Sequence, residues 1–267
     1  MVELAFKRRG AGTVLDRLYQ AGCGKARVLR PEPKAPGPEA VLINTAGGLT
    51  GGDDLRWRVE WHAGCTATVT SQAAEKVYRS LGDDARIETR LAVAREARAE
   101  WLPQETILFD RARVCRRMEI DVQTGGTLLA CEAFLFGRTA RGEVVTKGFL
   151  HDAWRVRYGG RLVWADALRL DGAIDARLAC GAIADGARAV ASVLHVAEDA
   201  GRRLQLARAL MEGARSRAAA SCIGPVLIVR FLASDGAVLR RDLQAWIAGF
   251  RAGAGGLPAR VPRVWSP

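Results

Sequence analysis

Alternating apolar and polar residues dominate the first two thirds of the chain. Residues 55–62 (LRWRVEWH) place apolar side chains on one face and polar ones on the other, which predicts a half-buried strand. Residues 65–70 alternate in a similar way after an Ala-Gly turn, so the two segments together predict a hairpin. Further strands are expected at residues 85–93, 97–102, 113–122, 127–136, 143–149, 154–158 and 161–165.

The last third of the chain has a different pattern. A strand at 187–196 is followed by helical periodicity over 198–214, a strand at 226–233 and a second helix. The apolar residues of this second helix recur at helical spacing, at Leu239, Leu243, Trp246, Ile247 and Phe250. We expect the helix to end at Gly253 or Gly255.

These elements predict a fold class. Many short strands without helical periodicity between them argue against a parallel α/β sheet and leave an all-β sandwich, barrel or solenoid. No linker or break in composition divides the chain, so we expect a single domain over residues 1–267. It is predicted to be β-rich over 1–196 and mixed strand and helix over 197–267, with two packed helices.

The composition is that of a globular chain. Of the 267 residues 49% are hydrophobic, and no apolar run approaches the roughly 18 residues that a membrane span needs. No apolar segment follows the basic residues 7–9, so we expect no signal peptide and a cytoplasmic location. The six cysteines lack the paired spacing of metal sites and are expected to be reduced, small apolar residues.

Net charge is the one unusual bulk property. Lys and Arg total 40 against 29 Asp and Glu, which gives a net charge of +11. This excess favours acidic partners, either nucleic acid or an acidic protein surface. The basic residues are spread along the chain and form no stripe with aromatic residues, so a nucleic-acid-binding β-protein is the alternative and not the leading interpretation.

Three segments contain most of the candidate chemistry: 44–54 (NTAGGLTGGDD), 70–80 (TSQAAEKVYRS) and 101–111 (WLPQETILFDR). The first lacks the Lys-Ser/Thr of a phosphate-binding loop, so its paired glycines favour a structural turn. Glu105 and Asp110 could serve as the acid and base of a hydrolase, a class that the sequence leaves open.

The three histidines suggest no catalytic arrangement. His62 is expected to face solvent, because it falls on the polar side of its predicted strand. His151 is expected in a turn beside Asp152, and His195 in the core of an apolar strand.

Taken in order, these segments resemble a known family. NTAGGLTGGD, TSQAAEKVYRS and WLPQETILFDRA, followed by FGRTARGE at 136–143 and PRVW at 262–265, are similar to the motifs of the urease accessory protein UreD (UreH) family. The resemblance extends from Phe6 to Trp265. Any one motif is weak evidence, but five in order at compatible spacing are specific.

The resemblance implies a fold and a function. The fold would be a mainly β, β-helix-like stack of many short strands with two α-helices in the C-terminal third. The protein would be a non-enzymatic chaperone that binds UreF, and UreG through UreF, and docks on the urease apoprotein, with a possible dimer in the accessory complex. Nickel would pass through an internal tunnel without any tightly bound cofactor, and nucleic acid would not be a partner.

The tunnel that the resemblance implies directs attention to carboxylates in the matching motifs, because hard oxygen ligands bind nickel weakly and release it readily. The candidates are Asp53, Asp110 and Glu143 first, then Glu75 and Glu105. The alternative is that these carboxylates pair with Arg79, Arg111 or Arg138 and fix turns. The remaining motif positions are assigned structural roles: Gly47, Gly48, Gly51, Gly52, Ser71, Gln72, Tyr78, Arg79 and Arg138.

Overall fold

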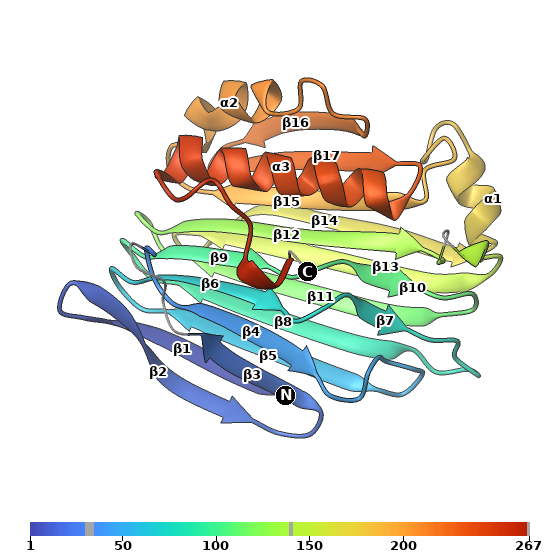
Figure 1. The fold of residues 1–267 in the computed structure, drawn as a ribbon, viewed down its shortest axis with the longest axis horizontal. Helices are drawn as coiled ribbons and strands as arrows, with labels where there is room; N and C mark the ends of the chain where they lie inside the picture. The colour runs from blue at the N-terminus through green and yellow to red at the C-terminus, as the bar shows by residue number, and fades with distance from the viewer. Residues whose placement is uncertain (30–34, 139–140, 266–267) are drawn as a thin grey trace.

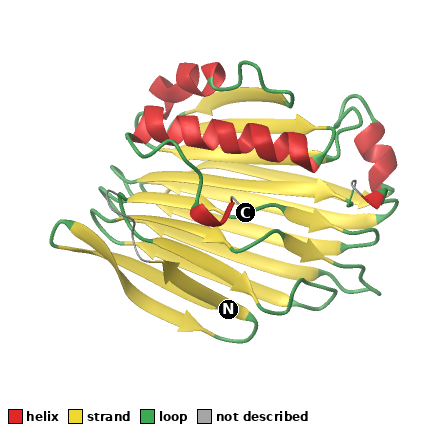
Figure 2. Ribbon diagram, viewed as in Figure 1, coloured by secondary structure: helices red, strands yellow, loops and turns green. Residues whose placement is uncertain are grey.

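Two large β-sheets lie face to face in the computed structural model, which describes residues 1–29, 35–138 and 141–265 (Figure 1). The prediction of a mainly β stack of strands is confirmed, and so is the prediction of two helices in the C-terminal part (Figure 2). The motif at 136–143 is described except for residues 139–140.

One sheet has seven strands in the order β14-β13-β11-β8-β5-β1-β2. Parallel pairing joins the five middle strands, β1, β5, β8, β11 and β13. The two edge strands, β2 and β14, pair with their neighbours in antiparallel orientation. The strands are β1 (Val2–Arg9), β2 (Gly12–Gln20), β5 (Asp54–Trp61), β8 (Ala85–Val93), β11 (Arg113–Val122), β13 (Gly148–Tyr158) and β14 (Arg161–Gly172).

The other sheet has ten strands, with the main order β16-β17-β15-β12-β9-β6-β4-β3 and the short strands β7 and β10 beside β12. Parallel pairing joins β4, β6, β9 and β12, and antiparallel pairing joins β12, β15, β17 and β16. The strands are β3 (Gly24–Leu29), β4 (Glu39–Asn44), β6 (Thr66–Ser71), β7 (Glu75–Val77), β9 (Arg98–Leu102), β10 (Thr106–Leu108), β12 (Thr127–Phe136), β15 (Ala189–Val196), β16 (Arg217–Ile223) and β17 (Val226–Ala233).

The chain winds between the sheets as a solenoid. It passes from β5 to β6 and β7, then to β8, β9 and β10, and then to β11 and β12, so each strand pairs in parallel with its counterpart one coil later. The predicted hairpin between 55–62 and 65–70 is therefore wrong. These segments became β5 and β6 in opposite sheets, because the four residues between them turn the chain across the stack instead of reversing it.

Burial along the strands follows from this arrangement. In β5 and β8 alternate residues are buried, since one face of the seven-stranded sheet is exposed. By contrast β12 is buried on both faces. Leu128 and Phe134 of β12 pack between the sheets, whereas Leu129 and Ala133 belong to a second apolar cluster that includes residues of α2 and α3.

The helices are α1 (Ile174–Ala179), α2 (Leu204–Ala209), which continues the 3₁₀ turn η2 (Ala200–Arg203), and α3 (Gly236–Gly255). Asp235 caps α3 by accepting a hydrogen bond from the backbone N–H of Val238 at 2.9 Å. The helix ends at Gly255, one of the two predicted ends, and is followed by the C-cap Gly256, whose φ of 60° suits glycine. Within the described residues, no helix is long and apolar enough to cross a membrane.

Two other local predictions are wrong. The strands expected at 143–149 and 154–158 are one continuous strand, β13, that begins at Gly148. His151 consequently lies within β13 and not in a turn. Strands β1 to β4, β7, β10 and β16 and helix α1 were not predicted. The edge strand β2, for example, is exposed on most of its length and shows no clear alternation.

The C-terminal 3₁₀ turn, η3 (Arg263–Trp265), contacts both α3 and the ten-stranded sheet. The indole N–H of Trp265 donates to Thr70 Oγ1 at 2.9 Å and to the Leu102 carbonyl at 3.1 Å. The Trp265 carbonyl in turn accepts a hydrogen bond from Arg240 at 2.8 Å. This residue therefore fastens the C-terminal segment to β6, β9 and α3.

We expect Trp265→Ala to lower the free energy of unfolding by about 3–5 kcal/mol, because it empties a buried site and leaves polar groups without partners. Urea denaturation of the variant and the wild type measures the difference. Leu81→Ala is the control, since Leu81 is 94% exposed and its removal should change stability little. Equal stability of the Trp265 variant and the wild type would contradict this role.

Candidate functional site

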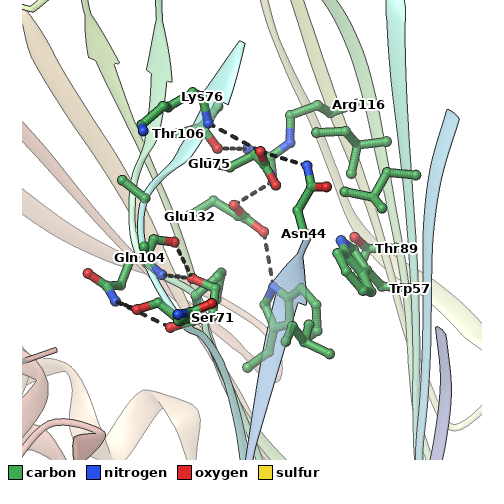
Figure 3. A pocket seen from close by; sticks show the side chains of 18 of the residues that line it. Asn44, Trp57, Ser71, Glu75, Lys76, Thr89, Gln104, Thr106, Arg116 and Glu132 are labelled. Atoms are coloured by element: carbon green, nitrogen blue, oxygen red, sulfur yellow. Dashed lines mark hydrogen bonds and ion pairs between the residues drawn. The ribbon is translucent and has the colours of Figure 1, made fainter. Parts of the chain in front are cut away.

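A cavity of about 260 Å³ lies between the two sheets, next to the motif segments (Figure 3). Its walls come from both sheets, with β5, β8 and β11 on one side and β4, β6, β7, β10 and β12 on the other. The polar and aromatic residues that line it include Asn44, Trp57, Ser71, Glu75, Lys76, Thr89, Gln104, Thr106, Arg116 and Glu132.

An ionic cluster crosses from one sheet to the other at this cavity. Arg116 on β11 reaches Glu132 on β12, with Nη2 and Oε2 2.5 Å apart. Its Nε lies 3.8 Å from Oδ1 of Asp152, its register partner on the neighbouring strand β13. Arg116, Glu132 and Asp152 are 6%, 3% and 6% exposed. These charges are thus almost fully removed from solvent.

Neighbouring side chains hold the two carboxylates in place. The indole N–H of Trp101 donates to Glu132 Oε1 at 3.0 Å, and that of Trp154 donates to Asp152 Oδ2 at 2.8 Å. Arg116 Nη1 donates to Thr106 Oγ1 at 3.2 Å. Among the described residues, the buried Nε of Arg116 has no hydrogen-bond partner. The guanidinium is therefore incompletely satisfied, whereas each carboxylate is fixed by an indole.

The cluster has an excess of negative charge. Glu75, Glu132 and Asp152 all interact electrostatically with the single guanidinium of Arg116. Burial is the main cause that raises the pKa of Asp152 to about 6; Arg116 opposes the rise, and the charges of Glu132 and Asp166 add to it. Burial also raises the pKa of Glu75, although a hydrogen bond from Asn44 at 3.0 Å opposes this. Such a site favours an additional positive charge.

A second cavity, of about 220 Å³, lies farther along the space between the sheets. Glu132 lines both cavities, and Asp152 and Asp166 line the second. An ion pair between Asp166 and Arg230 lies at the wall of this second cavity. Carboxylates therefore follow one another from Glu75 through Glu132 and Asp152 to Asp166.

The motif segments form one stack beside the first cavity. Leu49, Val77, Leu108 and Phe136 come from successive coils and lie next to one another in parallel register, and all four are buried. Backbone hydrogen bonds of 2.7–3.0 Å connect the four segments, for example from Tyr78 N–H to the Leu49 carbonyl. These four motif segments therefore occupy the same position in consecutive coils.

The structural roles expected for the glycines have a geometric basis in this stack. Gly48 has a φ of 151°, and a Cβ there would lie 2.4 Å from Cε2 of Tyr78. A Cβ at Gly51 would lie 2.2 Å from Ser80 Oγ. Gly47 and Gly52 also have positive φ values, of 77° and 88°. Close packing between coils therefore excludes a side chain at Gly48 and Gly51.

Other motif residues hold neighbouring loops. Ser71 Oγ accepts a hydrogen bond from Gln104 N–H at 2.9 Å, and the Gln72 carbonyl accepts one from Gln104 Nε2 at 2.9 Å. The Tyr78 hydroxyl donates to the Gly47 carbonyl at 3.2 Å. The Arg79 carbonyl accepts a hydrogen bond from the Thr50 hydroxyl at 3.0 Å.

Of the five predicted carboxylates, Glu75 lines the cavity. Asp53 accepts a hydrogen bond from the Thr50 N–H at 2.8 Å inside its own turn. Glu105 forms an ion pair with Arg240 of α3 at 2.7 Å. Asp53 and Glu105 are thus engaged in holding backbone segments, while a role for any of them toward nickel stays a prediction.

Asp110 and Glu143 both hold the loop that precedes β13. Asp110 accepts hydrogen bonds from the backbone N–H groups of Thr146 and Lys147 at 2.7 and 3.2 Å. Burial raises the pKa of Asp110, but the hydrogen bonds from Thr146 and Lys147 lower it, and the pKa lies below its usual value. Glu143 pairs with Arg138 at 2.8 Å, and this hydrogen bond lowers the pKa of Glu143. The expected pairing with Arg138 is therefore present.

The residues of the ionic cluster other than Glu75 were missed from the sequence. Glu132 interrupts the otherwise apolar strand at 127–136, and this single charge was the available signal. Arg116 and Asp152 gave no such signal, because they lie on strands with many other charged residues. Their proximity depends on the pairing of β11 with β13, which the sequence did not predict.

Acid–base or metal chemistry receives little support elsewhere. Glu105 and Asp110 are engaged by different segments, α3 and the loop before β13. His62 is exposed and His195 is buried, as expected. Burial lowers the pKa of His195 to about 4. In the described part of the chain, no three His, Cys, Asp or Glu side chains meet in an arrangement that could hold a metal ion.

Comparison with known proteins gives one consistent result. A family model described as "UreD urease accessory protein" matches residues 1–266. Proteins named urease accessory protein UreD are similar to this chain: that of Azorhizobium caulinodans is 46% identical over 246 residues, covering 92% of this chain and 89% of the relative. That of Xanthobacter autotrophicus is 47% identical over 257 residues (96% and 86%), and that of Brucella suis is 43% identical over 266 residues (99% and 92%).

The raised pKa of Asp152 predicts a pH dependence. The usual aspartate pKa is 3.8 and the folded value is about 6, so the folded chain holds a proton that the unfolded chain has lost. Stability from this group is therefore lost as the pH rises from about 4 to about 6, by about 3 kcal/mol. Asp152→Asn cannot titrate and should lack this loss.

Urea denaturation at several pH values between about 4 and 7 measures this effect. Relative to wild type, Asp152→Asn should gain about 3 kcal/mol in unfolding free energy across that range. Asp171→Asn, which changes an exposed carboxylate paired with Arg169, serves as the matched control. A constant difference between the Asp152 variant and wild type would show that Asp152 does not titrate in this range.

Proposed function

This chain belongs to the UreD family of urease accessory proteins, and we propose that it passes nickel ions to apo-urease through the cavities between its two sheets. Family membership supports a role in urease maturation. Its relatives are named as accessory proteins and not as enzymes, which is consistent with a non-enzymatic chaperone.

The observation that carries the nickel proposal is the series of carboxylates along the space between the sheets, in which Glu132 and Asp152 are buried and share the single guanidinium of Arg116. Uncompensated negative charge in a low-dielectric interior attracts a divalent cation strongly. Oxygen ligands arranged one after another, and not converging in a closed cage, bind nickel weakly enough to release it. Charge draws the ion in, and the series of single carboxylates lets it move on.

The partners in this proposal are UreF, UreG bound through UreF, the urease apoprotein, and a second copy of this chain in the accessory complex. The outer face of the seven-stranded sheet is a candidate docking surface. Arg86, Arg117 and Arg155 on this face are exposed and form no ion pair within the described residues. Acidic surfaces on the partners would complement them.

Glu75→Gln tests the route. The change keeps the shape of the side chain and its contact with Asn44 but removes one negative charge from the cavity. We expect urease produced together with this variant and the other accessory proteins to contain about ten-fold less nickel. Removing one charge near the ion costs more than the about 1.4 kcal/mol that equals a factor of ten.

The control for this experiment is Asp54→Asn, which removes an exposed carboxylate paired with Arg56. Nickel content is measured by elemental analysis of purified urease, and thermal unfolding shows that both variants are folded. Normal nickel content with Glu75→Gln would remove Glu75 from the route. Normal nickel content when the whole chain is omitted would refute the proposed function.

The exposed arginines on the outer face of the seven-stranded sheet give a separate prediction. The association rate of this chain with UreF and apo-urease should fall about ten-fold as salt is raised, because long-range attraction is screened. Arg117→Gln with Arg155→Gln should slow association at low salt, whereas Arg56→Gln, which changes an already paired arginine, should not. Steeply salt-dependent binding to DNA, with no effect of salt on the protein partners, would favour the nucleic-acid alternative.

A further inference from the structure

The cavity between the sheets already contains a buried positive charge. The guanidinium of Arg116 lines the first cavity and lies among the carboxylates of Glu132, Asp152 and Glu75, of which Glu132 lines both cavities. A cation travelling along this series of carboxylates would therefore meet a position that an arginine side chain occupies.

Arg116 is held less completely than a structural buried arginine in the same protein. Arg251 forms two hydrogen bonds to Glu100, from Nε at 2.8 Å and from Nη2 at 3.0 Å, and a third to a backbone carbonyl. Arg116 instead makes one close contact to Glu132 and one hydrogen bond to Thr106, and its guanidinium lies over the Phe134 ring, 4.9 Å from the ring centre. Its contact to Asp152 is long, and its Nε has no hydrogen-bond partner among the described residues.

The carboxylates do not depend on Arg116 for their orientation. The indoles of Trp101 and Trp154 bind the second oxygen of Glu132 and of Asp152. Loss or movement of the guanidinium would leave both carboxylates in place, each with one oxygen free to take another cation. Asn44 holds Glu75 in the same way.

We propose that Arg116 is a placeholder cation, whose guanidinium occupies the point at which a divalent cation would bind Glu132 and Asp152. The cluster then accepts a metal ion when Arg116 is displaced and expels it when Arg116 returns. This inference rests on the proposed function for its biological meaning, but its geometry can be tested on the isolated chain. Its consequence is that removing the guanidinium creates a stable metal site.

Arg116→Gln is the test variant, and Co²⁺ and Ni²⁺ are the probes. Without the guanidinium, the buried carboxylates of Glu132 and Asp152 lack a counter-charge, and a divalent cation supplies it. Equilibrium dialysis should find about one Co²⁺ per chain, bound at least about ten-fold more tightly than by wild type. Thermal unfolding should show that the variant is destabilised in the presence of a chelator and regains stability when Co²⁺ or Ni²⁺ is added.

Two controls identify the site. The double variant Arg116→Gln/Glu132→Gln removes both members of the ion pair and should lose the added Co²⁺ binding. Arg251→Gln breaks the other buried ion pair outside the cavity, and it should be destabilised without any rescue by metal. Rescue of Arg251→Gln to the same extent would mean that metal stabilises the protein non-specifically, which overturns the proposal.

Arg116→Lys keeps the experiment decisive if Arg116→Gln does not fold. The ammonium group is a single point charge and cannot replace the fork of the guanidinium, so one carboxylate stays available and added Co²⁺ binding is expected here as well. No added binding by either variant overturns the placeholder role.

Urease activation separates this inference from the proposed function. If Arg116→Gln gains the metal site and lowers the nickel content of urease, the placeholder role and the proposed function are both supported, because the variant retains the nickel ion that urease should receive. If it gains the site but urease fills normally, Arg116 occupies a cation site that is not on the nickel route. If no site appears, the placeholder role fails whatever the urease result.

Discussion

Parallel pairing between successive coils is the constraint on which the rest of this structure depends. It aligns residues that are about thirty to forty positions apart in the chain, so that Arg116 faces Asp152 and Thr106 faces Glu75 at equal register. A slip of one residue would turn every side chain of a strand to the opposite face. The buried charges and the motif stack therefore share one register, and neither can form unless the coils are correctly aligned.

The ionic cluster lowers the stability that an otherwise apolar interior would have. Burying the carboxylates of Glu132 and Asp152 with the guanidinium of Arg116 costs desolvation energy that a single close ion pair does not recover, and apolar residues of equal volume would often be as stable. The contrast with Arg251 and Glu100 is informative, because that buried pair is fully hydrogen-bonded and joins α3 to β9. Incomplete satisfaction at Arg116 is typical of a group whose position serves function and not stability.

The sequence predicted local structure better than long-range structure. Alternation located β5, β8 and β11, and helical spacing located α3, because each pattern reports burial within a single element. The same alternation suggested a hairpin at β5 and β6, since nothing local distinguishes a reversal from a crossing between sheets. Among the candidate residues Glu75 was found through its motif, whereas Arg116 and Asp152 meet only through strand pairing.

The motif stack explains why the carboxylates with the strongest sequence signal differ from those with the most unusual environment. Motif residues such as Asp110 and Glu143 lie in turns, where hydrogen bonds to the backbone fix the path from one coil to the next. All three hydrogen bonds to Asp110 end on Oδ1, and both oxygens of Glu143 accept hydrogen bonds from Arg138. The strands that the turns position instead supply Glu132 and Asp152, whose charges face an interior space. Motif residues and buried charges therefore depend on each other: the turns set the register of the coils, and the register brings the buried charges together between the sheets.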